Sequence, residues 1–386
     1  MFFNFHPEYN PDVKIAELID SPSDTSTTSW RPYPDVGFQK QITTVLSMRI
    51  DSANNRLWLL DFGLHGMMDT PALIAISLES DTEVIKHTFP KAVAGMGSML
   101  NDFAISIDGR IVYIADTSIL AQSPAILVYS VEENLSYRLL SSLPSLYGQS
   151  SFFNIHQQEI GFGPFGMKIN VDSIALSRDN RALYFAPLTG SDLLCVDVSL
   201  LHAAMCEPDG KDCLVHQEML RQGVQVVLHD KPITDGITTD EDGNVWLTAL
   251  GHSSIGSCHP LLIPPQYVVS LNMACRTAVN NLTSSPTCAV ALLYRHVCIG
   301  LASPVPVTEP SAGGCGSASF SDNTDIDSEA IPDNDVGVGV RSSGICGPLT
   351  IHNVIENTDL LRWADGFSFG PGECGAAHTP YTILLA

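Results

Sequence analysis

Oxygen-bearing side chains recur at one position of a repeated pattern in this sequence. Each stands at the entry to a run rich in β-branched and aromatic residues, and together they are Asn101, Asp172, Asp235 and Asp365. Carboxylate and amide oxygens are the ligands that a hard cation such as Ca²⁺ takes from proteins. The same residue types also cap strands and hydrogen-bond turns. The pattern therefore predicts either a shared cation or ligand site or a set of local caps, and the fold decides between the two.

The repeated unit that carries these residues is a strand, a tight turn and a second strand. Its central copy spans residues 100–116, where Asp108-Gly109 lies between two apolar runs, as is typical of a β-hairpin. Further copies lie at residues 43–61, 171–187 and 234–248, and a fifth begins at Trp363. Units of one kind spaced by tens of residues are typical of β-propeller blades. We therefore predict an all-β propeller, in which the entries to the innermost strands converge on the axis.

The chain divides into three segments on this interpretation. Residues 1–255 hold blades one to five, with the first blade partial, and residues 349–386 hold the end of blade five and a partial last blade. Residues 256–348 are rich in Pro, Gly, Ser and Cys and have no steady period. This segment is either a long irregular insertion or a stretch of non-homologous translation. Joining Ile255 to Thr350 would restore a blade of ordinary length.

Composition limits the class of partner. The chain has 386 residues, 45% of them hydrophobic, which is enough for a large core. Its 19 basic and 42 acidic residues give a net charge of -23, which argues against nucleic acid and anionic membrane as partners. An acidic chain suits a cationic ligand or a divalent metal, although a soluble acidic surface explains the charge equally well.

Targeting and cysteine signals are sparse. No apolar run of about 18 residues predicts a membrane-spanning helix, and no basic region with an apolar core marks a signal peptide at the start. No Cys-x-x-Cys pair supports zinc. Cys206 and Cys213 could close a loop in an oxidising compartment or be free thiols. The triplets at Asn134 and Asn281 are glycosylation sequons if the protein is secreted.

Six segments, taken in order, resemble the signature segments of the major royal jelly protein/yellow family. They are 57–63 (LWLLDFG), 100–105 (LNDFAI), 113–116 (YIAD), 174–177 (IALS), 183–188 (LYFAPL) and 361–366 (LRWADG). The resemblance covers most of residues 10–255 and 349–370. It implies a six-bladed β-propeller, here with incomplete first and last blades, that is usually secreted and has a ligand cavity at one end of the channel. Characterised members include small-amine binders and proteins linked to pigment chemistry.

The architecture is also similar to that of the gluconolactonase and paraoxonase propellers, which hold calcium in the channel. Those enzymes use an acidic residue from the first blade, Asn from the third and fourth, and Asp from the fifth. Asn101, Asp172 and Asp235 fall at the last three places, so the resemblance implies calcium as the cofactor there. Asp172 departs from the pattern, and the first-blade acid has no counterpart, which argues against a catalytic calcium.

Two histidines are candidate catalytic bases on the same resemblance. His65 lies near the place of a channel histidine in paraoxonase-like enzymes, and His252 follows the fifth hairpin in a similar way. In a lactonase, such a base would activate water while the metal polarises the carbonyl. The alternative for each is an ordinary solvent-exposed loop histidine.

Three functions therefore remain in competition. The first is an extracellular propeller of the yellow type that binds a small, cationic ligand. The second is a calcium-dependent lactonase or esterase. The third is a scaffold whose faces bind other proteins, since propellers often serve in this way.

Overall fold

The central hairpin forms as the sequence predicts. In the computed structural model, β8 (Leu100–Ile105) pairs antiparallel with β9 (Ile111–Asp116), and Ala104 lies opposite Tyr113. Gly109 takes a φ of +69° in the connecting turn. A side chain there would start 2.5 Å from the Asp51 carboxylate of the neighbouring hairpin, so only glycine fits this position.

The structure describes most of the region from residue 29 to residue 260 and several shorter pieces outside it. The described residues are 2–5, 11–19, 29–149, 152–155, 158–161, 166, 168–206, 212–240, 243–250, 254–260, 345–347 and 349–356.

Four sheets of four antiparallel strands follow one another along the chain, each in sequential strand order. The first two sheets are β4 (Val45–Asp51), β5 (Arg56–Asp61), β6 (Ala72–Ser77) and β7 (Thr82–Thr88), then β8, β9, β10 (Ala125–Ser130) and β11 (Leu135–Leu139). The next two are β14 (Val171–Leu176), β15 (Ala182–Pro187), β16 (Leu193–Asp197) and β17 (Gln225–Leu228), then β18 (Ile237–Thr239), β19 (Val245–Ala249), β20 (Ser254–Pro260) and β21 (Leu349–Glu356).

Smaller elements accompany these sheets. A three-stranded sheet precedes them, formed by β1 (Phe2–Asn4), β2 (Ile15–Ile19) and β3 (Ser29–Pro32). The hairpin of β12 (Phe153–Ile155) and β13 (Gln158–Ile160) lies between the second and third four-stranded sheets. The helical pieces are η2 (Phe38–Lys40), α1 (Gly63–Gly66), η3 (Pro144–Leu146), α2 (Val198–Ala203) and α3 (Cys213–Gly223).

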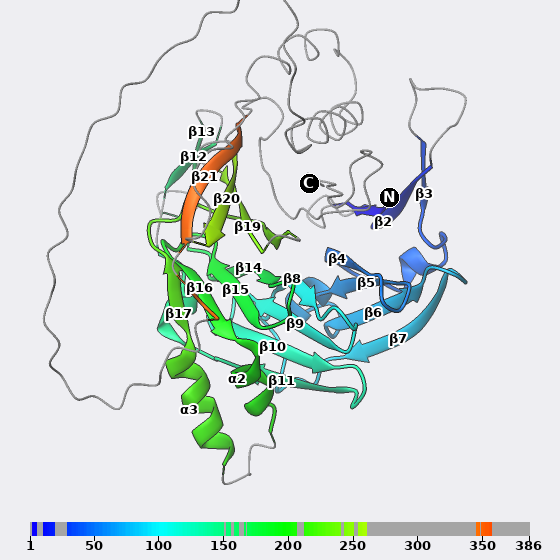
Figure 1. Cartoon of the computed structure of the whole chain (residues 1–386). Helices are drawn as coiled ribbons and strands as arrows, with labels where there is room; N and C mark the ends of the chain where they lie inside the picture. The colour runs from blue at the N-terminus through cyan, green and yellow to red at the C-terminus, as the bar shows by residue number, and fades with distance from the viewer. Residues whose placement is uncertain are drawn as a thin grey trace, which may run out of the picture.

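The sheets are arranged as the blades of a β-propeller, which confirms the predicted fold. The first strands β4, β8, β14 and β18 contact one another in turn, and β1 lies against β4. The last strands β7, β11 and β17 lie at the periphery (Figure 1). The partial last blade, predicted within residues 349–386 and including Asp365, lies beyond residue 356, the last residue that the structure describes.

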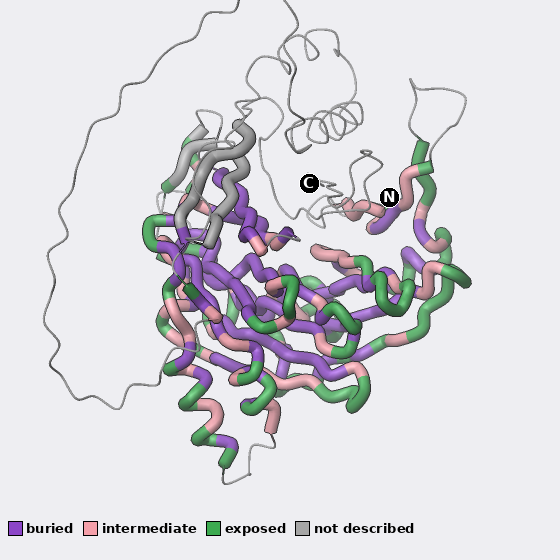
Figure 2. Tube along the Cα trace, in the orientation of Figure 1, coloured by how far each residue is buried: buried purple, intermediate pink, exposed green. Residues whose placement is uncertain are grey.

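Apolar side chains pack between neighbouring blades, and β9 shows how. Val112 and Ile114 belong to the cluster shared with the β4–β7 blade, whereas Tyr113 and Ala115 belong to the cluster shared with the β14–β17 blade. Both faces of this strand are therefore buried, which explains why apolar and polar residues do not alternate along it. Figure 2 shows that buried residues follow the strands and that exposed residues gather at the turns.

The last of these sheets is closed by a strand from far along the chain. β20 pairs antiparallel with β21 over seven residue pairs, from Ser254 opposite Glu356 to Pro260 opposite Leu349. β20 therefore continues past residue 255, where the sequence analysis begins the insertion. Most of the residues between the two strands are not described, and the division into three segments stays a prediction.

Two disulfides join described elements. Cys206–Cys213 connects the end of α2 to the start of α3, and Cys195–Cys346 links β16 to the residues that precede β21. The sequence leaves open whether Cys206 and Cys213 form a disulfide or are free thiols, and the structure has the disulfide. The second pair had no sequence signal, because its cysteines are 151 residues apart.

Candidate functional site

The first strands bring two of the predicted residues to the same end of neighbouring blades. Asn101 is the second residue of β8 and Asp172 the second residue of β14, and these strands contact each other. Asp235 lies two residues before β18, which contacts β14 in turn. We refer to this end, where the first strands begin, as the entry end. Whether the three side chains share one ion or ligand stays a prediction.

The pairing of strands is irregular at Asn101 and at Asp172. The register between β8 and β9 shifts between Leu100 and Phe103, and that between β14 and β15 shifts between Val171 and Ser173. Asn101 and Asp172 therefore lie within the shifts. Such bulges change the direction of a side chain relative to a regular strand and recur beside functional sites.

Other side chains cap the backbone at the entries, which was the alternative role for the predicted residues. Asp61 accepts hydrogen bonds from the backbone N–H groups of Thr43 and Thr44 at 2.6 and 2.8 Å. Asp116 accepts one from Met99 at 2.9 Å. In the β18–β21 blade, the Thr248 hydroxyl accepts from the backbone N–H groups of Asp235 and Gly236 at 3.0 and 3.1 Å. In three blades, therefore, the caps come from the second strand or its end.

The three candidates differ in their surroundings. Asp172 is 2% exposed and accepts a hydrogen bond from the Thr117 hydroxyl at 3.1 Å, and Asp235 is 8% exposed. Asn101 is partly exposed, and its side chain makes no hydrogen bond within the described part of the chain. The neighbouring Asp102 instead pairs with Arg49 of β4 at 2.9 Å.

Lys231 is a buried cation at this end that the sequence analysis missed. It is 5% exposed, and its Nζ donates to the carbonyl oxygens of Pro232 at 3.1 Å and Leu188 at 3.4 Å. Burial lowers the pKa of Lys231 to about 7, while the negative charges of Asp172 and Asp192 oppose that shift. The charges of Lys231 and Asp172 therefore interact, and Asp172 is one of the residues predicted to bind a cation or ligand. In the sequence Lys231 looks like any other loop lysine, because its contact with Leu188 joins residues that are 43 positions apart.

His65 is half-buried in α1, at the entry end of the β4–β7 blade. Its backbone has a φ of +59°, and its ring packs edge-on against Phe62 with centroids 5.2 Å apart. Burial lowers the pKa of His65, so the ring is neutral near pH 7. Its Nδ1 atom is buried and has no hydrogen-bond partner among the described residues. The carbonyl of His65 accepts from the Gly97 N–H at 2.8 Å, which ties this loop to the segment before β8.

The other predicted base and the fourth predicted ligand, His252 and Asp365, lie outside the described residues. Within the described part of the chain, no three carboxylate, imidazole or thiolate groups come together as a metal site. The predicted calcium set has only two groups of those kinds, Asp172 and Asp235, because its third donor is an amide. That finding therefore leaves the predicted set untested.

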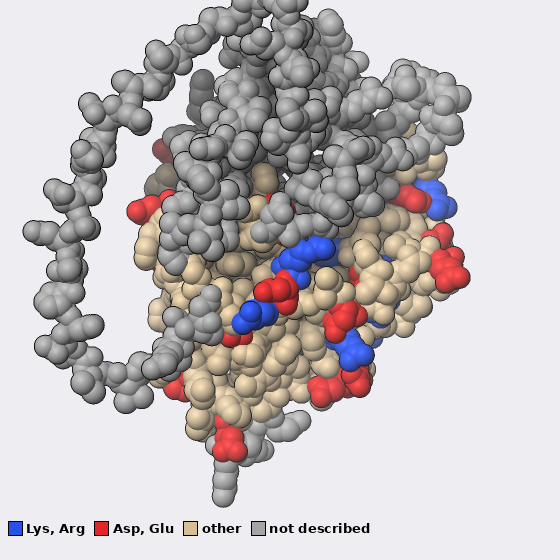
Figure 3. Space-filling model, in the orientation of Figure 1, with Lys and Arg blue, Asp and Glu red and all other residues tan. Residues whose placement is uncertain are grey.

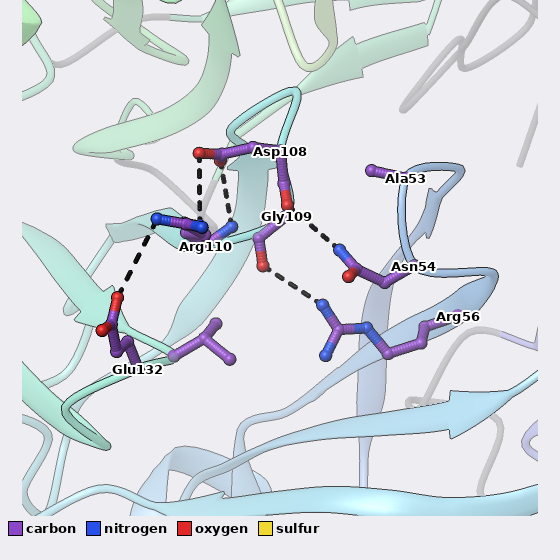
Figure 4. Close-up of a pocket in the computed structure, with 8 residues that line it drawn as sticks. Ala53, Asn54, Arg56, Asp108, Gly109, Arg110 and Glu132 are labelled. Atoms are coloured by element: carbon purple, nitrogen blue, oxygen red, sulfur yellow. Dashed lines mark hydrogen bonds and ion pairs between the residues drawn. The ribbon is translucent and has the colours of Figure 1, made fainter.

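A surface pocket lies at the opposite end of the first strands, between two blades. Its volume is about 520 Å³, and its lining residues are Ala53, Asn54, Arg56, Asp108, Gly109, Arg110, Val131 and Glu132 (Figure 4). Arg56 pairs with Asp51 at 2.7 Å and also donates to the Gly109 carbonyl at 3.2 Å. Arg110 lies between Asp108 and Glu132, at 3.8 and 4.0 Å.

The charged groups of this pocket hold adjacent turns together. The pocket is also remote from Asn101 along the strand, so we do not take it as the candidate site. On the molecular face drawn in Figure 3, acidic and basic side chains are spread among uncharged ones. No helix among the described residues is long and apolar enough to cross a membrane.

Comparisons with known proteins support the fold that this geometry shows. The family model described as "Major royal jelly protein" matches residues 43–260, which is more than half of the chain. A search of curated proteins found no match.

Solved structures with similar folds are remote in sequence. A hydrazine synthase from Kuenenia stuttgartiensis is 10% identical with a TM-score of 0.40, over 61% of this chain and 62% of that one. A streptogramin B lyase is 13% identical with a TM-score of 0.35, over 63% and 57%. A gluconolactonase from Xanthomonas campestris is 12% identical with a TM-score of 0.32, over 55% and 58%. The chain spans less than two thirds of the length of these structures.

Proposed function

Because the chain belongs to the major royal jelly protein family, whose model matches residues 43–260, we propose that it binds a small ligand at the entry end of its propeller. The binding groups are Asn101, Asp172 and Asp235. One observation supports this assignment above others. In the blades of Asn101 and Asp235, other side chains cap the backbone at the entry. In the blade of Asp172, the Thr189 hydroxyl accepts from the backbone N–H of Ile169 at 2.9 Å, so these three polar residues are not needed for that purpose.

The ligand that suits this site is a small organic cation. Two of the three binding groups are carboxylates, and the chain carries a net charge of -23. A cation gains most from carboxylates that are largely withdrawn from water, because the surrounding dielectric screens them less. Lys231 partly offsets the charge of Asp172. The carboxylate of Asp235 and the amide oxygen of Asn101 are further groups that can bind an ammonium group.

A thermal-shift screen with primary amines tests this proposal, using uncharged alcohols of the same size as ligand controls. We expect saturable stabilisation by at least one amine and none by its matched alcohol. The stabilisation should be lost in Asp235→Asn and kept in Glu132→Gln, which removes an exposed carboxylate at the opposite end. Equal stabilisation of both variants would remove the proposed site.

Calcium is the proposed alternative occupant of the same groups. Two carboxylates and an amide fit calcium in donor type, and backbone carbonyls and water would complete the six to eight oxygens that calcium takes. The ammonium of Lys231 near Asp172 works against a second cation. Calorimetric titration with calcium chloride, with Asp235→Ala as control, tests this occupant, and absence of binding up to millimolar calcium would remove it.

A lactonase or esterase activity is the second candidate function, favoured by the state of His65. Its ring is neutral near pH 7 because burial lowers its pKa, and its Nδ1 makes no hydrogen bond within the described residues. A neutral imidazole can take a proton from water at a nitrogen that water reaches, which for His65 is Nε2, because Nδ1 is buried. A bound calcium would supply polarisation of the substrate carbonyl. Lactone hydrolysis that stops with a chelator and falls strongly in His65→Gln would support this activity, and hydrolysis unaffected by both would contradict it.

We also propose that the protein is extracellular. Disulfides persist in oxidising compartments and are rare in the cytosol, and two disulfides connect elements of this fold. Secretion of the full chain with both disulfides formed, read by mass spectrometry under non-reducing conditions, is the expected result. Free thiols at all four cysteines would argue against it.

A further inference from the structure

The turn between β10 and β11 carries the triplet Asn134-Leu135-Ser136, a sequence that oligosaccharyl transfer requires. Asn134 is the last residue of this turn, is exposed, and has a φ of +54°. Leu135 is 47% exposed. The triplet therefore lies on a tight turn at the surface and is not buried between blades.

Hydrogen bonds orient the amide of Asn134. Its Oδ1 accepts from the Tyr129 hydroxyl at 3.0 Å and lies 3.1 Å from Nδ1 of His87. The other ring nitrogen of His87 lies 3.0 Å from the Ser136 hydroxyl. Burial lowers the pKa of His87, so a neutral ring donates from Nδ1 and accepts the Ser136 proton at Nε2.

This arrangement leaves the amide nitrogen without a hydrogen bond within the described part of the chain. The amide oxygen accepts from Tyr129 and His87, so these contacts do not use the nitrogen on the other branch. Nδ2 of Asn134 makes no hydrogen bond to any residue in the described ranges. Because Asn134 is exposed, a substituent on Nδ2 would break no hydrogen bond seen among the described residues.

The position of the turn also suits a large substituent. The strands of this blade alternate in direction, so the β10–β11 turn lies at the end opposite Asn101. A glycan there would leave the entry end open. The two disulfides point to the oxidising compartment in which glycans are attached.

We propose that Asn134 carries an N-linked glycan. During transfer, Nδ2 of Asn134 forms a bond to the anomeric carbon of a lipid-linked oligosaccharide pyrophosphate. The bond from that carbon to the pyrophosphate oxygen breaks, the lipid pyrophosphate leaves, and Nδ2 loses one proton. Transfer takes place on the unfolded chain, after which Oδ1 can still accept from Tyr129 and His87.

The test uses the full chain behind a secretion leader in a eukaryotic host, with Asn281→Gln as the background that removes the other sequon. We expect one endoglycosidase-sensitive glycan in the soluble protein, and conversion of residue 134 to Asp on enzymatic release. Ser136→Thr should keep the glycan, because it preserves both the sequon and the hydroxyl. Ser136→Ala should lose it.

Asn134→Asp separates glycosylation from folding, because it removes the site of attachment and keeps an oxygen for Tyr129. This variant should be soluble and unglycosylated. The proposal is overturned if residue 134 is unmodified in the soluble protein, or if the glycan is found only on aggregated chain.

Discussion

Lys231 shows how a single buried charge affects the entry end. Its ammonium is 5% exposed and is bonded to two backbone carbonyl oxygens. Burial of the charged form is unfavourable, which lowers the pKa of Lys231 to about 7 even though two carboxylates favour the charge. The charge on this residue therefore differs between the folded and unfolded chain over a wide range of pH.

The free energy of unfolding should rise with pH because of this residue. Between pH 7 and about 10, the unfolded chain keeps a proton on Lys231 that the folded chain has lost. The free energy of unfolding therefore decreases as the pH falls from about 10 to 7, with a slope of at most about 1.4 kcal/mol per pH unit. Urea unfolding at pH 7, 8 and 9 should show this slope in the wild type and a flatter one in Lys231→Met. Parallel pH curves for the two proteins would contradict it.

The strand entries show which elements the sequence could predict. The hairpin around Asp108-Gly109 was predictable because its turn and flanking apolar runs are local signals. The capping role of Asp116 was not, because it depends on the backbone of Met99, which is 17 residues earlier.

Helix α3 was also missed. Few of its residues are buried, so the apolar spacing that predicts a helix is weak there.

Replacing Asp116 should destabilise its blade. Its buried carboxylate accepts from the N–H groups of Met99 and Ser118 and pairs with Arg138 at 2.7 Å. Asp116→Ala leaves these donors and the guanidinium without that partner, and we expect a loss of about 3–5 kcal/mol. Urea unfolding measures this loss.

An exposed acid provides the matched control for that measurement. Glu132 lies at the opposite end of the blade and is 4.0 Å from Arg110. Glu132→Ala should cost less than about 1 kcal/mol, because solvent screens exposed pairs. Similar losses for the two variants would show that the cap does not stabilise the entry.

The described sheets follow one another as propeller blades, and adjacent blades share apolar clusters. A disulfide reinforces one of these contacts, because Cys195 and Cys346 belong to the cluster shared by the β14–β17 and β18–β21 blades. The sequence predicts the repeated blades. It could not predict this pairing, since neither cysteine has a local pattern that identifies its partner.

The two disulfides should differ in their effect on stability. In the chain-entropy model, closing a loop of about 150 residues contributes about 5 kcal/mol and a loop of about 8 residues about 2.5 kcal/mol. Removing Cys195–Cys346 by double alanine substitution should therefore lower the free energy of unfolding more than removing Cys206–Cys213. Denaturant unfolding of both variants without reductant compares them. A larger loss for the short loop would contradict the model.

Ligand binding is assigned to one site formed by Asn101, Asp172 and Asp235, and a crystal structure with a bound amine is the most direct test of that assignment. The amine should be the one that stabilises the wild type most in the thermal-shift screen. We predict its ammonium group within hydrogen-bond distance, about 3 Å, of at least two of these side chains. An amine bound elsewhere, such as between Asp108 and Glu132, or three side chains too far apart to contact one ligand, would contradict the proposed site.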